Sequence, residues 1–244
     1  MKNFSIFLST VAIILAAVAI YSTCKCKAPV AGSSVNEEEL AAVLTQNPKI
    51  MADALTAYER YQREEAERIH NEMLAKFADK INSEENLPFV GPKDAKVAVV
   101  EFFDFSCGYC KRLSSSIEKI VADNPDVKVV FKPVSFVSQV SPYQAKGGIA
   151  AHKQGKFMEY YKEVMEFQGR MTEADVDAVA TKIGLNIDQF KTDLNSAETN
   201  NILGEVANLA QSIEVNGVPS VFVNAKQIPA MSPEPIQEAI NASK

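Results

Sequence analysis

The feature that most constrains this chain is a pair of cysteines, Cys107 and Cys110, placed between a predicted strand and a predicted helix. Residues 96–103 are mostly apolar and rich in valine, which predicts a buried strand. A cysteine at the start of the following helix meets backbone N–H groups without intrahelical partners, and these favour a thiolate. Thiolate is the nucleophile of thiol–disulfide exchange, and the second cysteine can attack the mixed disulfide that the first one forms. The motif therefore predicts redox chemistry.

A zinc site and a structural disulfide account less well for this cysteine pair. A structural zinc site needs four ligands, and the remaining candidates are Cys24, Cys26, His70 and His152, none of them near the pair in sequence. A purely structural disulfide across two residues closes too short a loop to add much stability. We therefore expect a redox-active disulfide and no metal.

The whole-chain charge and length limit the other classes of function. The chain has 244 residues, enough for one mid-sized domain and an extension. Its formal net charge of −6 gives no electrostatic support for nucleic-acid binding. A dithiol carries its own electrons, so we expect no metal or organic cofactor.

Residues 1–27 are typical of a targeting segment. A short basic start precedes an uncharged apolar run over residues 5–21, which suits either a cleaved signal peptide or an uncleaved membrane anchor. Cys24 adds lipidation as a third outcome. We favour cleavage, and all three outcomes place the folded body in the periplasm or cell envelope, where disulfides form. Residues 28–36 predict a small polar linker.

Residues 37–86 predict a charged helical extension. One short helix is expected first, and Pro48 marks the start of a longer one. Apolar residues recur in the longer helix mostly at three- and four-residue steps, interrupted by a charged stretch over residues 61–68. Such a stripe packs either on its own domain or on a second copy of the chain. We favour a homo-oligomerisation arm.

Residues 87–244 predict an α/β domain, separated from the extension by the Pro- and Gly-containing segment 87–92. A β-α-β unit of this length implies parallel strands with a right-handed crossover. The order is that of a thioredoxin fold with a helical domain inserted at about residues 138–214. Within that insertion, Thr172 with an acidic residue three positions later is typical of a helix start. The expected elements are strand 96–103, helix 107–123, strand 127–133, helices within 141–214, strand 220–224, strand 226–229 and helix 233–242.

The residues around the cysteines resemble the DsbA-like thiol:disulfide oxidoreductases of the bacterial envelope. Glu101 stands six residues before Cys107, and Val218-Pro219 matches the cis-proline dipeptide of that family. The resemblance implies that Cys107 is the nucleophile and Cys110 the resolving thiol. It also implies a buried Glu101 that accepts a proton, and a Val218 backbone that binds an extended substrate beside the dithiol.

Two positions depart from the DsbA pattern. Tyr109 stands where a histidine would stabilise the thiolate, and the resulting Cys-Gly-Tyr-Cys sequence is similar to the active site of the isomerase DsbC. Asn224-Ala225 replaces the usual Asn-Gly, so we expect a tight turn with positive φ to be disfavoured there.

The sequence thus predicts a periplasmic thiol:disulfide oxidoreductase that acts on unfolded or misfolded secreted proteins, with Tyr109, Val218 and Pro219 at the substrate. Its direction stays open between an oxidase, recharged by a quinone-linked membrane partner, and an oligomeric isomerase or reductase fed by a membrane thiol reductase. A function of another class, an envelope structural or chaperone-like binding protein with little redox role, is the further alternative.

Overall fold

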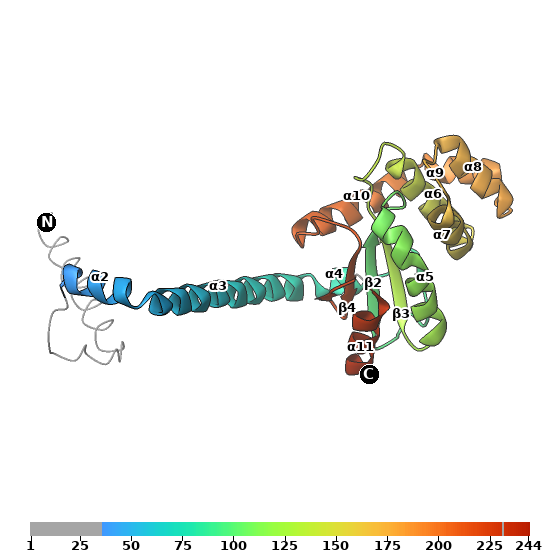
Figure 1. Cartoon of the computed structure of the whole chain (residues 1–244). Coiled ribbons are helices and arrows are strands. Elements are labelled where there is room, and N and C mark those ends of the chain that lie inside the picture. Colours follow the sequence, from blue (N-terminus) through green and yellow to red (C-terminus); the bar gives the residue numbers. More distant parts are fainter. Residues whose placement is uncertain (1–35, 231) are drawn as a thin grey trace, which may run out of the picture. The chain divides into compact units, whose positions relative to one another are not determined.

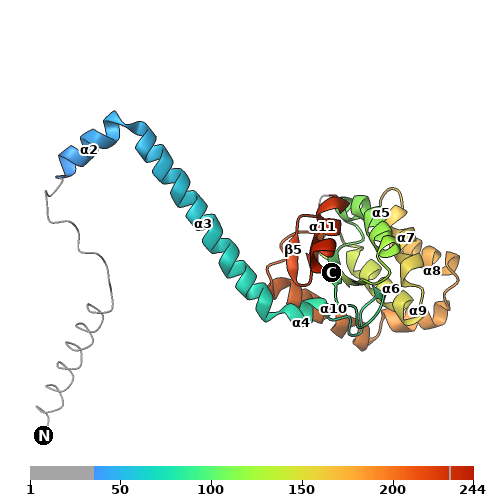
Figure 2. The same cartoon turned by 90° about the horizontal axis from the view of Figure 1, so that it is seen from below.

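The structure is a computed structural model that describes residues 36–230 and 232–244 (Figures 1 and 2). The predictions for residues 1–27, for Cys24 and Cys26 and for nearly all of the linker lie outside the described residues. The chain divides between Tyr61 and Gln62 into two units. None of the helices in the described part is both long enough and apolar enough to cross a membrane.

The first unit holds helix α2 (Glu37–Gln46) and the first half of helix α3 (Pro48–Lys76). Asn36 and Glu39 form a capping box at the start of α2, and Pro48 opens α3 as the sequence predicts. No residue of α2 is buried. Both helices expose large apolar side chains in this unit, namely Leu40, Val43, Ile50, Met51, Leu55, Tyr58 and Tyr61.

The second unit contains a five-stranded sheet with the order β1-β3-β2-β4-β5. β2 and β3 are parallel, while β1, β4 and β5 pair antiparallel with their neighbours. Helix α5 (Gly108–Asp123) makes the crossover between β2 and β3. The strands are β1 (Phe89–Val90), β2 (Ala98–Phe103), β3 (Lys128–Pro133), β4 (Ser220–Val223) and β5 (Lys226–Ile228).

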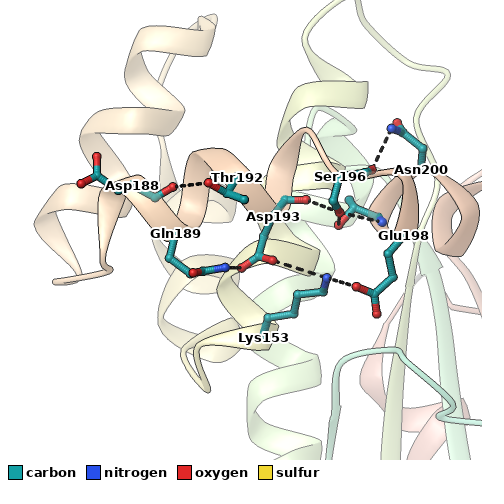
Figure 3. Close-up of polar contacts among 9 residues, drawn as sticks. Lys153, Asp188, Gln189, Thr192, Asp193, Ser196, Glu198 and Asn200 are labelled. Atoms are coloured by element: carbon teal, nitrogen blue, oxygen red, sulfur yellow. Dashed lines mark hydrogen bonds and ion pairs between the residues drawn. The ribbon is translucent and has the colours of Figure 1, made fainter.

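Five helices follow β3 and precede β4 in the chain, and they form the predicted insertion. They are α6 (Ser141–Lys153), α7 (Phe157–Glu166), α8 (Glu173–Lys182), α9 (Ile187–Leu194) and α10 (Ala197–Ser212), all of which are labelled in Figure 2. Lys153, at the end of the first of them, lies between two carboxylates: its Nζ is 2.5 Å from Glu198 Oε2 and 3.5 Å from Asp193 Oδ1 (Figure 3). This contact ties three of the helices together. The three helices are α6, which ends at Lys153, α9, which carries Asp193, and α10, which carries Glu198.

The central strand β2 is buried on both faces and separates two cores. Val99 and Phe103 belong to the core that contains both cysteines and the aromatic residues of α7. Val100 and Phe102 point the other way, into a core with α10 and the short helix α4 (Ala78–Asn82). The closing helix α11 (Pro233–Ser243) contacts α5. The fold is therefore the predicted thioredoxin fold with a helical insertion.

Two local features differ from the sequence-based expectations. Strand β1 lies inside segment 87–92, which was expected only to separate two regions. It is two residues long, too short for any periodic pattern. Asn224 and Ala225 do adopt positive φ angles of 47° and 62°. The Asn224 side chain holds this turn, because its Oδ1 accepts a hydrogen bond from the Ala98 backbone N–H at 2.9 Å.

Candidate active site

Helix α5 begins at the cysteine pair. Cys107 is the N-cap residue, and its Sγ accepts a hydrogen bond from the Cys110 backbone N–H at 3.5 Å. The turn between β2 and α5 is closed by a bond from the Cys107 N–H to the Asp104 carbonyl at 2.9 Å. Both cysteines are free thiols, with Cys107 6% exposed and Cys110 fully buried. Cys107 is thus the more accessible of the two.

The loop before β4 supplies the second side of the site. The Cys107 thiol donates a hydrogen bond to the Val218 carbonyl at 3.4 Å, although the two residues are 111 positions apart in sequence. The Val218–Pro219 peptide bond is cis. The loop reaches the dithiol because β4 pairs with β2, where Val221 stands opposite Glu101.

Glu101 lies in the middle of β2 with no exposed surface. Burial raises the pKa of its carboxyl from the usual 4.5 to about 8, and a hydrogen bond from the Tyr161 hydroxyl to Oε2 at 3.1 Å opposes that rise. The other oxygen, Oε1, has no hydrogen-bond partner among the described residues. Burial, followed by the nearby Glu101 charge, raises the pKa of Cys110. The two groups are therefore electrostatically coupled, and the Glu101 carboxyl is the buried acid that acts on Cys110.

Asp104 organises the turn before the cysteines, although nothing in the sequence pattern marks it. Its carboxylate is fully buried. It accepts hydrogen bonds from the Ser106 N–H and the Ser141 hydroxyl at 2.8 Å, and from the Phe136 and Val137 N–H groups at 3.0 Å. These bonds fasten the loop after β3 to the dithiol turn.

A cleft of about 200 Å³ runs beside the dithiol. Tyr109 and Pro219 both line it, and the Tyr109 side chain is 55% exposed. The Arg112 guanidinium carbon stands 4.2 Å from the centre of the Tyr109 ring, in a cation–π contact. The remaining lining residues are Leu113, Ser116, Ala230, Ser232 and Pro233.

The structure thus brings together all six residues predicted for the site. Tyr161 was missed, because it lies 60 positions from Glu101 in a helix that carries no motif. A larger groove, of about 440 Å³, lies between α4 and α10 and includes none of these residues. In the described residues, no group of three or more His, Cys, Asp or Glu side chains is arranged to hold a metal ion.

The chain matches known proteins in sequence over most of the second unit. The thioredoxin family model matches residues 83–242. A probable disulfide bond formation protein D from Bacillus cereus is 31% identical over 148 residues, which cover 55% of this chain and 68% of that protein. The Na(+)/H(+) antiporter NhaA 1 of Salinispora arenicola is 29% identical over 139 residues, or 56% of this chain. The chain spans only about a fifth, 21%, of that antiporter's length.

Solved structures show the same fold. A thioredoxin-like oxidoreductase from Silicibacter pomeroyi is 28% identical with a TM-score of 0.64, covering 68% of this chain and 96% of its own. The thiol-disulfide exchange protein alpha-DsbA2 from Wolbachia pipientis is 18% identical with a TM-score of 0.68, covering 72% and 97%. A periplasmic thioredoxin-like protein from Salmonella enterica serovar Typhimurium is 22% identical with a TM-score of 0.60, covering 68% and 94%.

Proposed function

Because the chain belongs to the thioredoxin family, in its DsbA-like group, we propose that it exchanges disulfides with secreted proteins through Cys107 and Cys110. One observation carries this proposal. Two free thiols stand at the N-terminus of α5, with Cys107 against the Val218 carbonyl and a buried carboxyl group, Glu101, interacting with Cys110.

The chemistry follows from these positions. The Cys107 thiolate attacks a substrate disulfide, forms a mixed disulfide and releases one substrate thiolate, which takes a proton from water. Cys110 gives its proton to Glu101, and the resulting thiolate attacks Cys107 Sγ. The Cys107–Cys110 disulfide forms, the second substrate thiolate leaves, and two electrons pass from the protein to the substrate. The reverse sequence of steps oxidises a substrate dithiol.

Substrate binding is assigned to the backbone of Val218 and to the cleft that Tyr109 and Pro219 line. An unfolded chain can lie extended beside Val218 and place an apolar side chain in this cleft, whose walls include Leu113 and Ala230. Unfolded or misfolded secreted proteins supply such segments. We place the protein in the periplasm, a proposal supported by the apolar segment in residues 1–27 and by the location of the Salmonella neighbour.

The direction of exchange depends on the reduction potential of the cysteine pair. An oxidase would accept disulfides from a quinone-linked membrane partner, and an isomerase or reductase would receive electrons from a membrane thiol reductase. Equilibration with a glutathione buffer decides between them. A potential of about −120 mV favours the oxidase, and one of about −200 mV or lower favours the isomerase or reductase.

Residues 37–86 are proposed as a homo-oligomerisation arm. The exposed apolar side chains of α2 and α3 support this proposal, because scattered surface apolar residues are ordinary but a run of them along one element is a mark of an interface. An isomerase benefits from a second subunit that holds the misfolded substrate.

Trapping the mixed disulfide tests the proposed function directly. With Cys110→Ser, we expect a stable covalent complex with a secreted protein whose disulfides have been scrambled, visible on a non-reducing gel. With Cys107→Ser, we expect no complex. If Cys107→Ser left disulfide formation in secreted proteins unchanged, the chain would be a structural or chaperone-like protein instead.

A further inference from the structure

Glu101 has two chemically different oxygens. Oε2 accepts the Tyr161 hydroxyl at 3.1 Å, whereas Oε1 is buried and has no hydrogen-bond partner among the described residues. A buried carboxylate oxygen without a partner is costly, and a role in gaining and losing a proton accounts for its presence. Oε1 is therefore the oxygen of Glu101 that is free to bind a proton.

Tyr161 is held in place by aromatic packing. Its ring meets those of Phe103, Phe131 and Phe157 with centroids 5.4, 5.1 and 5.8 Å away. The side chain is fully buried, so the hydroxyl cannot turn towards water. The hydroxyl therefore stays on Glu101.

Among the residues that the structure describes, no cation acts on Glu101 in competition with Tyr161. Besides Glu101 and Tyr161, the titratable groups that face the site are Cys107, Cys110 and Glu118, all at or on α5. None of these three carries a positive charge. Tyr161 is therefore the group that stabilises the ionised Glu101.

We propose that Tyr161 of the inserted helical domain is a positioning residue for proton exchange between Glu101 and Cys110. It holds Oε2, keeps Oε1 free for the proton and stabilises the carboxylate that must form before Cys110 can ionise. The proposal rests on the proposed function, since it concerns the resolving step of the same dithiol. It also means that helix α7, besides packing on the sheet, places the Tyr161 hydroxyl on the Glu101 carboxyl of β2.

Tyr161→Phe tests this proposal because phenylalanine keeps the ring and removes only the donor. The Tyr161 hydrogen bond lowers the pKa of Glu101, so its loss raises that pKa above about 8. We expect the Glu101 titration, followed by ¹³C NMR of the carboxyl carbon, to move up by about one pH unit. The resolving step should then be about five- to tenfold slower at pH 7, with its pH profile displaced by the same amount.

Tyr160→Phe is the matched control. Tyr160 is the adjacent residue of α7 and is equally buried, but its hydroxyl donates to the Gln144 carbonyl at 2.9 Å and does not touch Glu101. This variant loses a buried hydrogen bond of the same kind, and we expect its Glu101 titration to match that of the wild type. In a Glu101→Gln background, Tyr161→Phe should cause no change in the pH profile.

A second measurement keeps Tyr161 in place, so that the proposal can be tested even if Tyr161→Phe does not fold. In the wild-type protein, the Tyr161 ¹³Cζ signal should shift with the midpoint of Glu101, and it should not shift in Glu101→Gln. Equal Glu101 titrations in wild type and Tyr161→Phe, or equal displacements in the two tyrosine variants, would overturn the proposal. The titrations need no substrate, so they test the role of Tyr161 alone. The proposed function would instead be refuted if the wild-type protein formed no mixed disulfides.

Discussion

Glu101 makes the stability of the folded chain depend on pH. Its pKa is raised from 4.5 to about 8, so between these values the folded state keeps a proton that the unfolded state has lost. The free energy of unfolding therefore falls as pH rises through this window, by up to about 5 kcal/mol. We expect Glu101→Gln to remove most of this dependence, measured by urea unfolding of the reduced protein at pH 5 and pH 8.

Glu84 supplies the control for that experiment. Its carboxylate bonds to Lys128 Nζ at 2.6 Å, and this contact lowers its pKa below 4.5. Glu84 is therefore ionised throughout the range from pH 5 to pH 8. Glu84→Gln should lower the unfolding free energy by a similar amount at both pH values. A steep pH dependence that survives in Glu101→Gln would contradict the assignment to Glu101.

At the level of single residues, the sequence predicts those that lie close to a motif. Cys107, Cys110 and Glu101 belong to one strand–turn–helix segment, so local spacing and a family resemblance identify them. Tyr161 comes from a helix whose position depends on how the whole insertion packs. Asp104 stands within the motif segment, but a carboxylate there is equally typical of an ordinary turn. Its four hydrogen bonds, two of them to the loop after β3, become visible only in the structure.

Among the elements, the loop between β3 and α6 depends most on one side chain. Asp104 Oδ2 accepts both the Phe136 and Val137 N–H groups at 3.0 Å. An amide group in its place cannot accept at all four positions, so Asp104→Asn should lower the unfolding free energy by about 2–4 kcal/mol. It should also speed hydrogen exchange at those two amides, which mass spectrometry or NMR can follow.

Asp94→Asn gives the comparison for the loop prediction, because Asp94 is an exposed acid of the same charge. We expect its unfolding midpoint and its amide exchange to stay close to those of the wild type. If Asp104→Asn behaved in the same way, the carboxylate would not be what fastens the loop.

The larger elements were predictable because each has a periodic or capping signal of its own. Apolar runs identify β2 and β3, and Thr172 with Asp175 forms the capping box expected before α8. Strand β1 gives no such signal, because two residues carry no period and its pairing depends on β3. The Asn224-Ala225 turn was also misjudged, since propensity disfavours Ala225 at positive φ while a long-range bond from Ala98 to Asn224 holds the turn.

At the scale of the whole molecule, the boundary between Tyr61 and Gln62 falls within the proposed arm, residues 37–86, and the buried core belongs to the unit that begins at Gln62. Leu74, the only buried residue of α3, lies after this boundary and belongs to the core of the second unit. Deletion of residues 1–61 therefore leaves every buried residue of the sheet domain in place. We expect the remaining chain to unfold at nearly the same urea concentration as the chain that lacks only residues 1–27.

The oligomeric state, unlike the unfolding midpoint, should change when residues 1–61 are deleted. If α2 and the start of α3 form the arm, the chain lacking residues 1–27 should be oligomeric by light scattering, and the chain lacking residues 1–61 monomeric. Met51→Glu with Leu55→Glu should have the same effect as the deletion, because both side chains are more than half exposed and charges there oppose apolar association. Lys49→Glu, on the same helix with a polar side chain, serves as control. An unchanged mass in all variants would show that these helices do not hold copies of the chain together. A monomeric variant that keeps its reduction potential but loses isomerase activity would show that the arm serves substrate handling.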